Sequence, residues 1–578
     1  MNTVVLMVLA FLGYIIAYRT YGIYIARKIL NVSDKNKMPA HEFKDGIDYV
    51  PTKRGIVFGH HFTTIAGIGP IVGPAIGIIW GWLPAFLWVF LGSIFMGAVH
   101  DLATLVISAR NQGKSIGDLT GNIVNNSTRY AFQFLIQFLL WMVLSLFTII
   151  VATLFVEYPE SVFPVWVQIP VAVWLGWKIR NGGNVFVYSV IAVLLMYISI
   201  IAGPYVPIEI SFIHDGVNAK LIWSLLILVY VFFASTVPVH KLLQPRDYIN
   251  SHQLLLAMVL LVLGIIIAHP RISAPAINHV AYKTDPNLPG LMPMLFITIA
   301  CGAISGFHSL ASSGTTVKQV NKEKDSILIG YGGMILEGFL AVLVIIAVAG
   351  GLGIGLAKGS TQLMGMNAFY EQYSSWKAIS AGIDISPKIA AFVVGASNLL
   401  SRIGIPSQFG TALIAVFVVS FANTTLDSAT RIQRLSLQEI FKTKRSTVIR
   451  PFNNRYFATF TVVLLAAILI FYQIRAKEAL KLWLIFGALN QLLAALGLGI
   501  ISIYLYYKKK NYLVAFIPML FVLTVTVWAM INNVMNLFNR NTILLLIIAV
   551  LVLVLTAWML VSGVKSLFMK RNRRAFSS

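Results

Sequence analysis

The chain has 578 residues, 58% of them hydrophobic and 11% charged, and its mean hydropathy is +0.82. This composition excludes a soluble globular domain, which needs far more polar surface, and indicates a protein that crosses a lipid bilayer many times. The net charge of +24 lies in short loops, which favours the positive-inside bias of membrane proteins beside anionic lipid over nucleic-acid binding. Cys301 is the only cysteine, so an intramolecular disulfide and a cysteine-based metal site are both excluded.

Apolar segments of about 20 residues predict fifteen membrane-spanning helices. The first lacks a basic start and a small-residue cleavage site, so we interpret it as a retained helix and not as a signal peptide. Two shorter amphipathic stretches, 114–127 and 387–402, are expected at a membrane interface. In chain order the predicted spans lie near 2–28, 55–80, 83–108, 130–156, 163–179, 184–202, 220–238, 251–268, 291–316, 327–356, 406–426, 456–474, 479–506, 512–532 and 542–564.

The distribution of basic residues predicts the orientation of these spans. With the N-terminus outside and the C-terminus in the cytoplasm, 32 of the 44 Lys and Arg residues fall in cytoplasmic loops or the tail. Such a bias over short loops is what decides topology.

The fourteen spans after the first divide into two sets of seven. Because seven is an odd number of crossings, the two sets must be oppositely oriented in the membrane. Each set opens with a segment rich in helix breakers, "GIGPIVGP" at 67–74 and "GAISGFHSLASSG" at 302–314. Small residues also serve ordinary helix packing. Two interrupted helices at matching positions of inverted repeats, however, mark the central site of a secondary transporter. The predicted parts are 1–54 (first helix and basic loop), 55–268 (first repeat with extra helices), 269–506 (second repeat core) and 507–578 (extra helices and basic tail).

The broken segments offer chemistry for a small zwitterion or a carboxylate. Free amide groups and the positive end of a half-helix suit a carboxylate, whereas freed carbonyls suit a cation. Glycines let a ligand approach the backbone, and hydroxyls act as donors or acceptors, Thr315 and Thr316 among them. The predicted substrate-binding residues are Gly67, Gly69, Gly73, Gly302, Ser305, Gly306, His308, Ser312 and Ser313.

Acidic and histidine residues within predicted spans are candidates for ion coupling, because buried charge is costly and imidazole titrates between pH 5 and 8. The alternative for each is a satisfied structural partner; for Asp427 a helix-end pair with Arg431 is the favoured interpretation. A metal site on the adjacent His60 and His61 is the weaker alternative, because their side chains point about 100° apart on a helix. We expect no cofactor beyond a coupling proton or sodium ion. The predicted coupling residues are His60, His61, Asp101, Glu337 and Asp427, and also Thr424 together with the carbonyls near Gly67 if sodium is the coupling ion.

Five motifs in the chain resemble the carbon starvation protein A family of bacterial transporters. They are "FGHHFTTIAGIGPIVGP" at 58–74, "ACGAISGFHSLASSGTTVKQ" at 300–319, "GYGGMILEG" at 330–338, T-x-x-D-x-x-T-R at 424–431 and "IFGALNQLLAAL" at 485–496. The resemblance covers residues from about 50 to 500. It implies uptake across the inner (cytoplasmic) membrane of peptides, or of pyruvate in some members, during carbon limitation.

The resemblance also implies an all-α fold like that of the LeuT-like amino acid–polyamine–organocation transporters, with five-helix inverted repeats and two discontinuous helices. The span 55–80 is then similar to core helix one and 406–426 to core helix eight, a pair that often holds a coupling cation.

The sequence therefore predicts a secondary active transporter for di- and tripeptides, coupled to protons or sodium, and not an enzyme. A symporter for pyruvate or another small carboxylate is the alternative. A channel, a metal-dependent intramembrane enzyme and a sensor derived from a transporter are further hypotheses. The sequence does not predict the oligomeric state.

Overall fold

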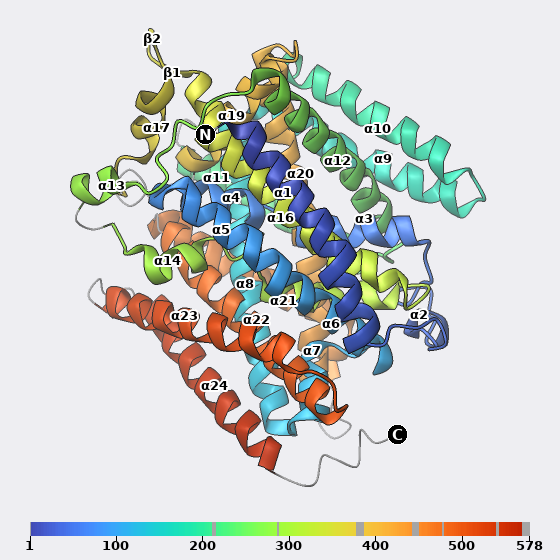
Figure 1. The fold of residues 1–578 in the computed structure, drawn as a ribbon. Helices are drawn as coiled ribbons and strands as arrows, with labels where there is room; N and C mark the ends of the chain where they lie inside the picture. Colours follow the sequence, from blue (N-terminus) through green and yellow to red (C-terminus); the bar gives the residue numbers. More distant parts are fainter. Residues whose placement is uncertain are drawn as a thin grey trace.

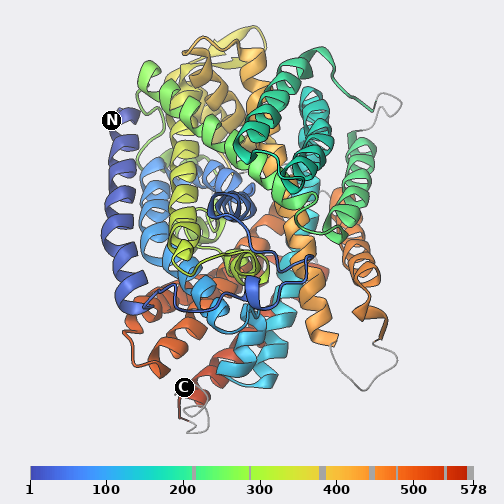
Figure 2. The same ribbon diagram turned by 90° about the vertical axis from the view of Figure 1, so that its right-hand side faces the viewer.

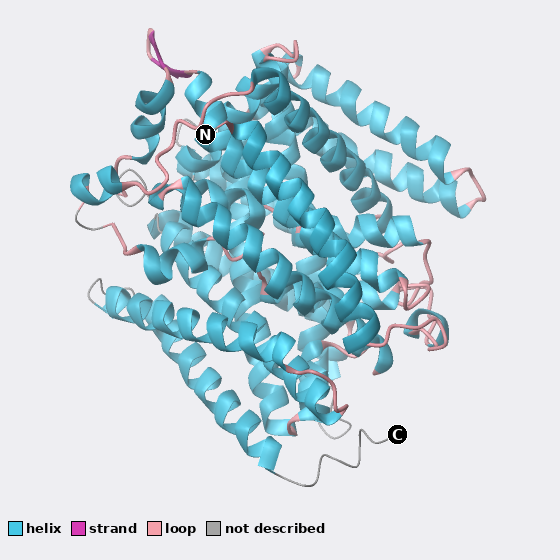
Figure 3. Cartoon of the chain, viewed as in Figure 1, coloured by secondary structure: helices cyan, strands magenta, loops and turns pink. Residues whose placement is uncertain are grey.

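A computed structural model gives the fold, and it describes residues 2–210, 216–285, 288–376, 386–441, 450–476, 479–538 and 543–568. The described chain is almost entirely helical, with one short antiparallel hairpin, β1 (Leu356–Lys358) and β2 (Thr361–Leu363) (Figure 3). Within these ranges, fourteen helices are long and apolar enough to cross a membrane. The prediction of an all-α protein with many spans is confirmed.

The helices of the first part of the chain run from α1 to α12. Their bounds are α1 (Thr3–Ala17), α2 (Pro39–Glu42), α3 (Arg54–Ile65), α4 (Gly69–Gly77), α5 (Trp82–Gly92), α6 (Ala98–Arg110), α7 (Ile116–Ile123), α8 (Asn126–Glu157), α9 (Val162–Arg180), α10 (Val185–Ala202), α11 (Gly216–Thr236) and α12 (Leu243–Ala268).

The helices of the second part run from α13 to α24. Their bounds are α13 (His279–Thr284), α14 (Leu291–Thr298), α15 (Gly306–Gly314), α16 (Gly333–Ile346), α17 (Gly365–Tyr373), α19 (Ser386–Ser401), α20 (Ser407–Phe441), α21 (Arg455–Ala476), α22 (Ala479–Tyr507), α23 (Leu513–Phe538) and α24 (Ile543–Phe568). Wider π-helical turns extend or join some of them, at Tyr18–Gly22, Ile25–Ile29, Ser93–Gly97, Ile327–Gly332 and Ala347–Gly351.

The spans differ in how deeply they lie within the protein. In the most apolar window of Arg54–Trp80 every residue is buried, and 94% are buried in that of Ile327–Ile354. Only 28% are buried in the windows of Val185–Tyr205 and Ile543–Lys565. Figures 1 and 2 show this arrangement, with α9 and α10 paired at one edge and α23 and α24 at the lower end. The broken segments therefore lie at the centre, and apolar peripheral helices surround them.

The first predicted break lies between α3 and α4, where residues 66–68 are not helical. Pro70, in the first turn of α4, explains why α3 stops. A proline ring clashes with the carbonyl group four residues earlier, which here belongs to Ala66, and proline has no amide hydrogen to donate. The same ring is well suited to the start of a new helix, so the chain begins α4 at once.

The second break lies between α14 and α15, where residues 299–305 are not helical. Gly302 has φ +88°, in the left-handed region that glycine tolerates best, and Ser305 is extended. The prediction of two discontinuous helices is confirmed.

Two details of the predicted spans are corrected. The segment 291–316 is two short helices, so it is absent from the fourteen long ones. The helix predicted from 251 begins instead at Leu243, which brings Arg246 and Asp247 into buried helix. The polar residues at 244–250 were left in a loop, but Arg246 pairs with Asp427 and Asp247 pairs with His60. The amphipathic stretches correspond to α7 and α19.

The start of α1 and the end of α24 lie at opposite ends of the molecule in Figure 1.

Candidate functional site

The two breaks lie against each other. A Cβ atom added to Gly73 would stand 2.8 Å from the carbonyl oxygen of Thr298, the last residue of α14. A Cβ atom added to Gly69 would stand 2.4 Å from the Cβ of Cys301. Because ordinary Cβ contacts are much longer, glycine is what allows these two broken segments to touch.

A row of ionisable side chains extends from α15 to the neighbouring helices. His308 Nδ1 lies 2.9 Å from Asp101 Oδ2 on α6, and His308 Nε2 lies 3.3 Å from Glu337 Oε2 on α16. His100 Nδ1 lies 3.1 Å from the other oxygen of the Asp101 carboxylate. All four side chains have 0% exposure. We call Asp101, His308 and Glu337 the acid–histidine triad.

The triad has a charge that depends on bound protons. Two carboxyl groups and one imidazole are neutral together when they hold two protons, and carry one negative charge when they hold one. A net charge buried away from water costs several kcal/mol unless it is paired. Loss of one proton therefore favours any rearrangement that brings water or a cation to the triad.

Side chains of α16 and α22 satisfy backbone groups that the second break leaves free. Gly302 donates its amide hydrogen to Glu337 Oε1 at 2.9 Å. Asn490 Oδ1 accepts from the amide of Phe307 at 2.9 Å, and Asn490 Nδ2 donates to Ser305 Oγ at 3.0 Å. In a membrane interior such groups must be paired. Glu337 thus contacts both the break and the triad.

The predicted hydroxyl groups near α15 have different environments. Ser313 Oγ donates to the carbonyl of Ser309 at 2.6 Å and accepts from the amide of Ile116 at 3.0 Å. Ser312 Oγ is buried and has no hydrogen-bond partner in the part of the chain that the structure describes. Ser312 is therefore the predicted serine whose hydroxyl is best suited to a ligand.

The adjacent histidines of α3 face different neighbours. His61 Nδ1 lies 3.0 Å from Thr316 Oγ1, and its ring packs on Gly333, one helical turn before Glu337. His60 instead pairs with Asp247 of α12. The two side chains therefore do not form one metal site. Among the described residues, no group of three or more His, Cys, Asp or Glu is arranged to hold a metal ion.

A second buried ionic cluster joins α3, α11, α12 and α20. Arg246 pairs with Asp427, and the hydroxyl of Tyr230 donates to the same Asp427 oxygen at 2.8 Å. The His60–Asp247 pair lies beside it, since Arg246 and Asp247 are adjacent. One arginine, one histidine and two carboxylates are neutral when the histidine carries its proton. This cluster is therefore a second buried group of ionisable side chains, separate from the triad, whose net charge depends on a bound proton.

The expected pair between Asp427 and Arg431 is wrong. Arg431 Nη1 donates to Asp48 Oδ1 at 2.9 Å, in the loop before α3. Oδ2 of Asp427 pairs instead with Arg246 of α12. The i, i+4 spacing on α20 permits a pair between Asp427 and Arg431, but each side chain binds a partner from a distant segment instead.

Thr424, the predicted sodium candidate, contacts α12. Its hydroxyl accepts from Asn250 of α12 and does not face the first break. The neighbouring Thr425 donates to the carbonyl of Thr64 at 3.2 Å, and Thr64 Oγ1 lies 3.2 Å from Ser428 Oγ. On α20, Thr425 and Ser428 are thus the hydroxyls that contact α3.

The remaining predicted glycines are covered by protein atoms. A Cβ atom on Gly67 would stand 2.3 Å from Thr425 Oγ1, and one on Gly306 would stand 2.4 Å from the carbonyl oxygen of Asn490. One on Gly302 would stand 2.9 Å from the Cβ of Ala341. A substrate reaches these backbone positions only if the helices around the breaks move apart.

Sequence reasoning missed several residues of this region. Asn490 lies in the motif at 485–496 and Tyr230 in an apolar span, and neither was assigned a role. Arg246 and Asp247 were placed in a loop. The signal for Asn490 was available, since an amide inside an apolar helix needs a partner.

Comparison with known proteins identifies the relatives of this chain. A family model described as "Carbon starvation protein CstA" matches residues 2–529. The "Peptide transporter CstA" of Bacillus subtilis (strain 168) is 30% identical over 90% of this chain and 88% of its own. The "Pyruvate/proton symporter BtsT" of Escherichia coli (strain K12) is 31% identical over 89% of this chain and 80% of its own.

Solved structures of transporters also resemble the chain. MhsT in complex with L-phenylalanine has a TM-score of 0.46 at 14% identity, covering 89% of this chain and 98% of its own. A manganese transporter from Eremococcus coleocola has a TM-score of 0.40 at 13% identity, covering 91% and 94%. The family match extends over nearly the whole length, and the two relatives are 30% and 31% identical over about nine-tenths of the chain. This chain belongs to the carbon starvation protein CstA family.

Proposed function

We propose that this membrane transporter takes up peptides together with a proton, and that the acid–histidine triad binds the proton. The observation that carries the proposal is the position of Glu337. One of its oxygens accepts from Gly302 at the break, and the other faces His308. A change in the protonation of this carboxyl group therefore acts directly on the backbone of the broken helix.

The proposed coupling is a competition for the amide groups of the break. When Glu337 gains a proton it becomes a weaker acceptor, and the amide of Gly302 is released for another anion. The carboxylate of a substrate suits that position, since the amide of Gly302 lies just before the start of α15, at the positive end of a half-helix. Proton and substrate then bind together, and loss of the proton favours return of Glu337 and release of substrate.

Pyruvate is the second candidate substrate. A relative of this chain is named a pyruvate/proton symporter, and pyruvate offers the same carboxylate as a peptide C-terminus. Sodium is the second candidate ion, for which the carbonyl of Thr64 and the hydroxyls of Thr425 and Ser428 supply oxygen atoms between α3 and α20.

Uptake by the full-length protein in liposomes tests the proposal. We expect a labelled dipeptide to accumulate above equilibrium under an inward pH gradient, with no requirement for sodium. Competition by unlabelled pyruvate, dipeptide and tripeptide then ranks the substrates. Passive equilibration without accumulation would indicate a channel, and accumulation only under a sodium gradient would contradict the proton.

A further inference from the structure

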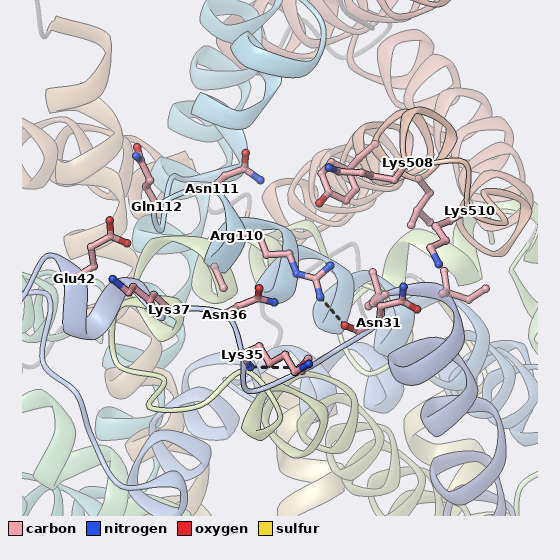
Figure 4. Close-up of a pocket in the computed structure, with 16 residues that line it drawn as sticks. Asn31, Lys35, Asn36, Lys37, Glu42, Arg110, Asn111, Gln112, Lys508 and Lys510 are labelled. Atoms are coloured by element: carbon pink, nitrogen blue, oxygen red, sulfur yellow. Dashed lines mark hydrogen bonds between the residues drawn. The ribbon is translucent and has the colours of Figure 1, made fainter. Parts of the chain in front are cut away.

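A basic pocket lies at the ends of three membrane helices, on the side that the charge bias places in the cytoplasm (Figure 4). Its volume is about 760 Å³. Its walls come from the end of the first span at Ile29 and Leu30, the loop that begins at Asn31, the end of α2 at Glu42, the end of α6 and the end of α22. The pocket is therefore at the level where the membrane helices meet the aqueous phase.

The side chains around the pocket are strongly biased towards positive charge. Five basic residues line it and Glu42 is the one carboxylate among its lining residues. Figure 4 shows Lys35 and Lys37 on the loop, Arg110 at the end of α6, and two lysines on the opposite side. The five are Lys35, Lys37, Arg110, Lys508 and Lys510.

One buried carboxylate fixes the shape of the pocket without removing this excess. Glu323 has 0% exposure and binds Arg110, with Nε 2.7 Å from Oε1. Its other oxygen accepts from the backbone of Ser33 at 2.7 Å and from the side chain of Asn36 at 3.0 Å. The loop is thereby held against α6, while the ammonium groups of Lys35 and Lys37 lie on exposed side chains.

The surroundings of the pocket belong to the membrane surface. Ile29, Leu30 and Leu505 line it and are almost fully buried, which gives it an apolar floor. Four tyrosines lie at or just beyond the end of α22, namely Tyr504, Tyr506, Tyr507 and Tyr512. Tyrosine concentrates at the level of lipid headgroups. Basic pockets between helix ends on the cytoplasmic side suit anionic headgroups.

We propose that this pocket binds the phosphate group of an anionic phospholipid, held mainly by Lys35 and Lys37. A phosphodiester is a permanent anion that accepts several charge-assisted hydrogen bonds, and lysine supplies them as a flexible point charge. A soluble phosphate offers the same anion, but the apolar floor and the tyrosines favour a ligand that also has an acyl part. The bound lipid connects the loop before α3 to the ends of α6 and α22.

Native mass spectrometry of the full-length protein in detergent tests the proposal with phosphatidylglycerol and with phosphatidylcholine of the same acyl chains. We expect tighter binding of phosphatidylglycerol. In the double variant Lys35→Gln and Lys37→Gln, its affinity should fall about 30-fold, because each lysine near an anionic lipid contributes about 1 kcal/mol. Both residues are exposed, and size-exclusion profiles should match those of the wild type.

The matched control is the double variant Arg180→Gln and Lys241→Gln, which loses the same charge on the same predicted side. Both are exposed residues outside the pocket. It should bind phosphatidylglycerol within about twofold of the wild type. Equal losses in the two double variants, or equal binding of the two lipids, would overturn the proposal. Displacement of the lipid by inorganic phosphate would overturn it in favour of a soluble anion.

Discussion

Replacement of Glu337 by Gln separates coupling from substrate movement. Gln carries no charge, so it resembles the protonated form of Glu337 as a weaker acceptor for the amide of Gly302, which Oε1 of Glu337 accepts at 2.9 Å, and it does not take up a proton. We expect Glu337→Gln to abolish accumulation driven by a pH gradient and to retain exchange of labelled for unlabelled substrate.

The expected size of the effect follows from the proton itself. One pH unit stores about 1.4 kcal/mol per proton, so one coupled proton accumulates substrate about tenfold when the membrane potential is clamped at zero. The variant should reach a ratio of about one. Its stability should change by about 1 kcal/mol or less if Glu337 is protonated in the folded protein, because Gln is then nearly isosteric.

The assay measures accumulation and exchange in the same liposomes, with thermal unfolding of the purified variant alongside. Loss of both activities together with a large fall in thermal stability would mean that Glu337 only holds the helices together through a buried ion pair, which is worth about 3–5 kcal/mol when broken. Wild-type accumulation by the variant would refute a coupling role for this residue.

Three further substitutions test other parts of the account. Gly69→Ala places a Cβ 2.4 Å from that of Cys301, so it should cost about 1–3 kcal/mol of stability in thermal unfolding and most of the uptake. The control is Gly55→Ala on α3, which has open space around it and should change neither. Asp427→Asn leaves the buried Arg246 without its carboxylate and should cost about 3–5 kcal/mol in thermal unfolding; a change below about 1 kcal/mol would show that the second cluster is dispensable for stability. Burial opposes ionisation of Asp48, but Arg431, Lys318 and Arg434 outweigh it and hold the pKa of Asp48 below 3.8. The ion pairs of Asp48 therefore stabilise the fold above about pH 4, and this stabilisation is lost as pH falls through the folded-state pKa. Asp48→Asn should lower the free energy of unfolding by about 3 kcal/mol at pH 7, and this difference from the wild type should vanish in acid. A difference that does not depend on pH would contradict this pairing.

The sequence was sufficient where the physical cause is local. A membrane span needs about 20 apolar residues in succession, and Pro70 in the first turn of α4 favours an end of α3 before Ala66. The fold class and the two breaks could therefore be predicted, and the rarity of ionisable residues within predicted spans brought His308, Asp101 and Glu337 to attention as separate residues.

The sequence was insufficient where partners come from distant segments. Nothing local indicates that His60 meets Asp247, or that Asp427 selects Arg246 over the Arg431 one turn away on its own helix. The start of α12 was misplaced for the same reason, because its polar residues look solvent-exposed until their partners on α3 and α20 are known. The joining of residues from α6, α15 and α16 into one buried triad is a property of the packed fold alone.

The movement of protons with substrate tests the central claim most directly. The full-length protein is reconstituted in liposomes that enclose a pH-sensitive dye, with equal pH on both sides and the membrane potential clamped at zero. The account predicts that adding an outside dipeptide acidifies the interior of liposomes with the wild-type protein, and not of those with Glu337→Gln. Substrate entry by the wild type without any acidification would contradict it.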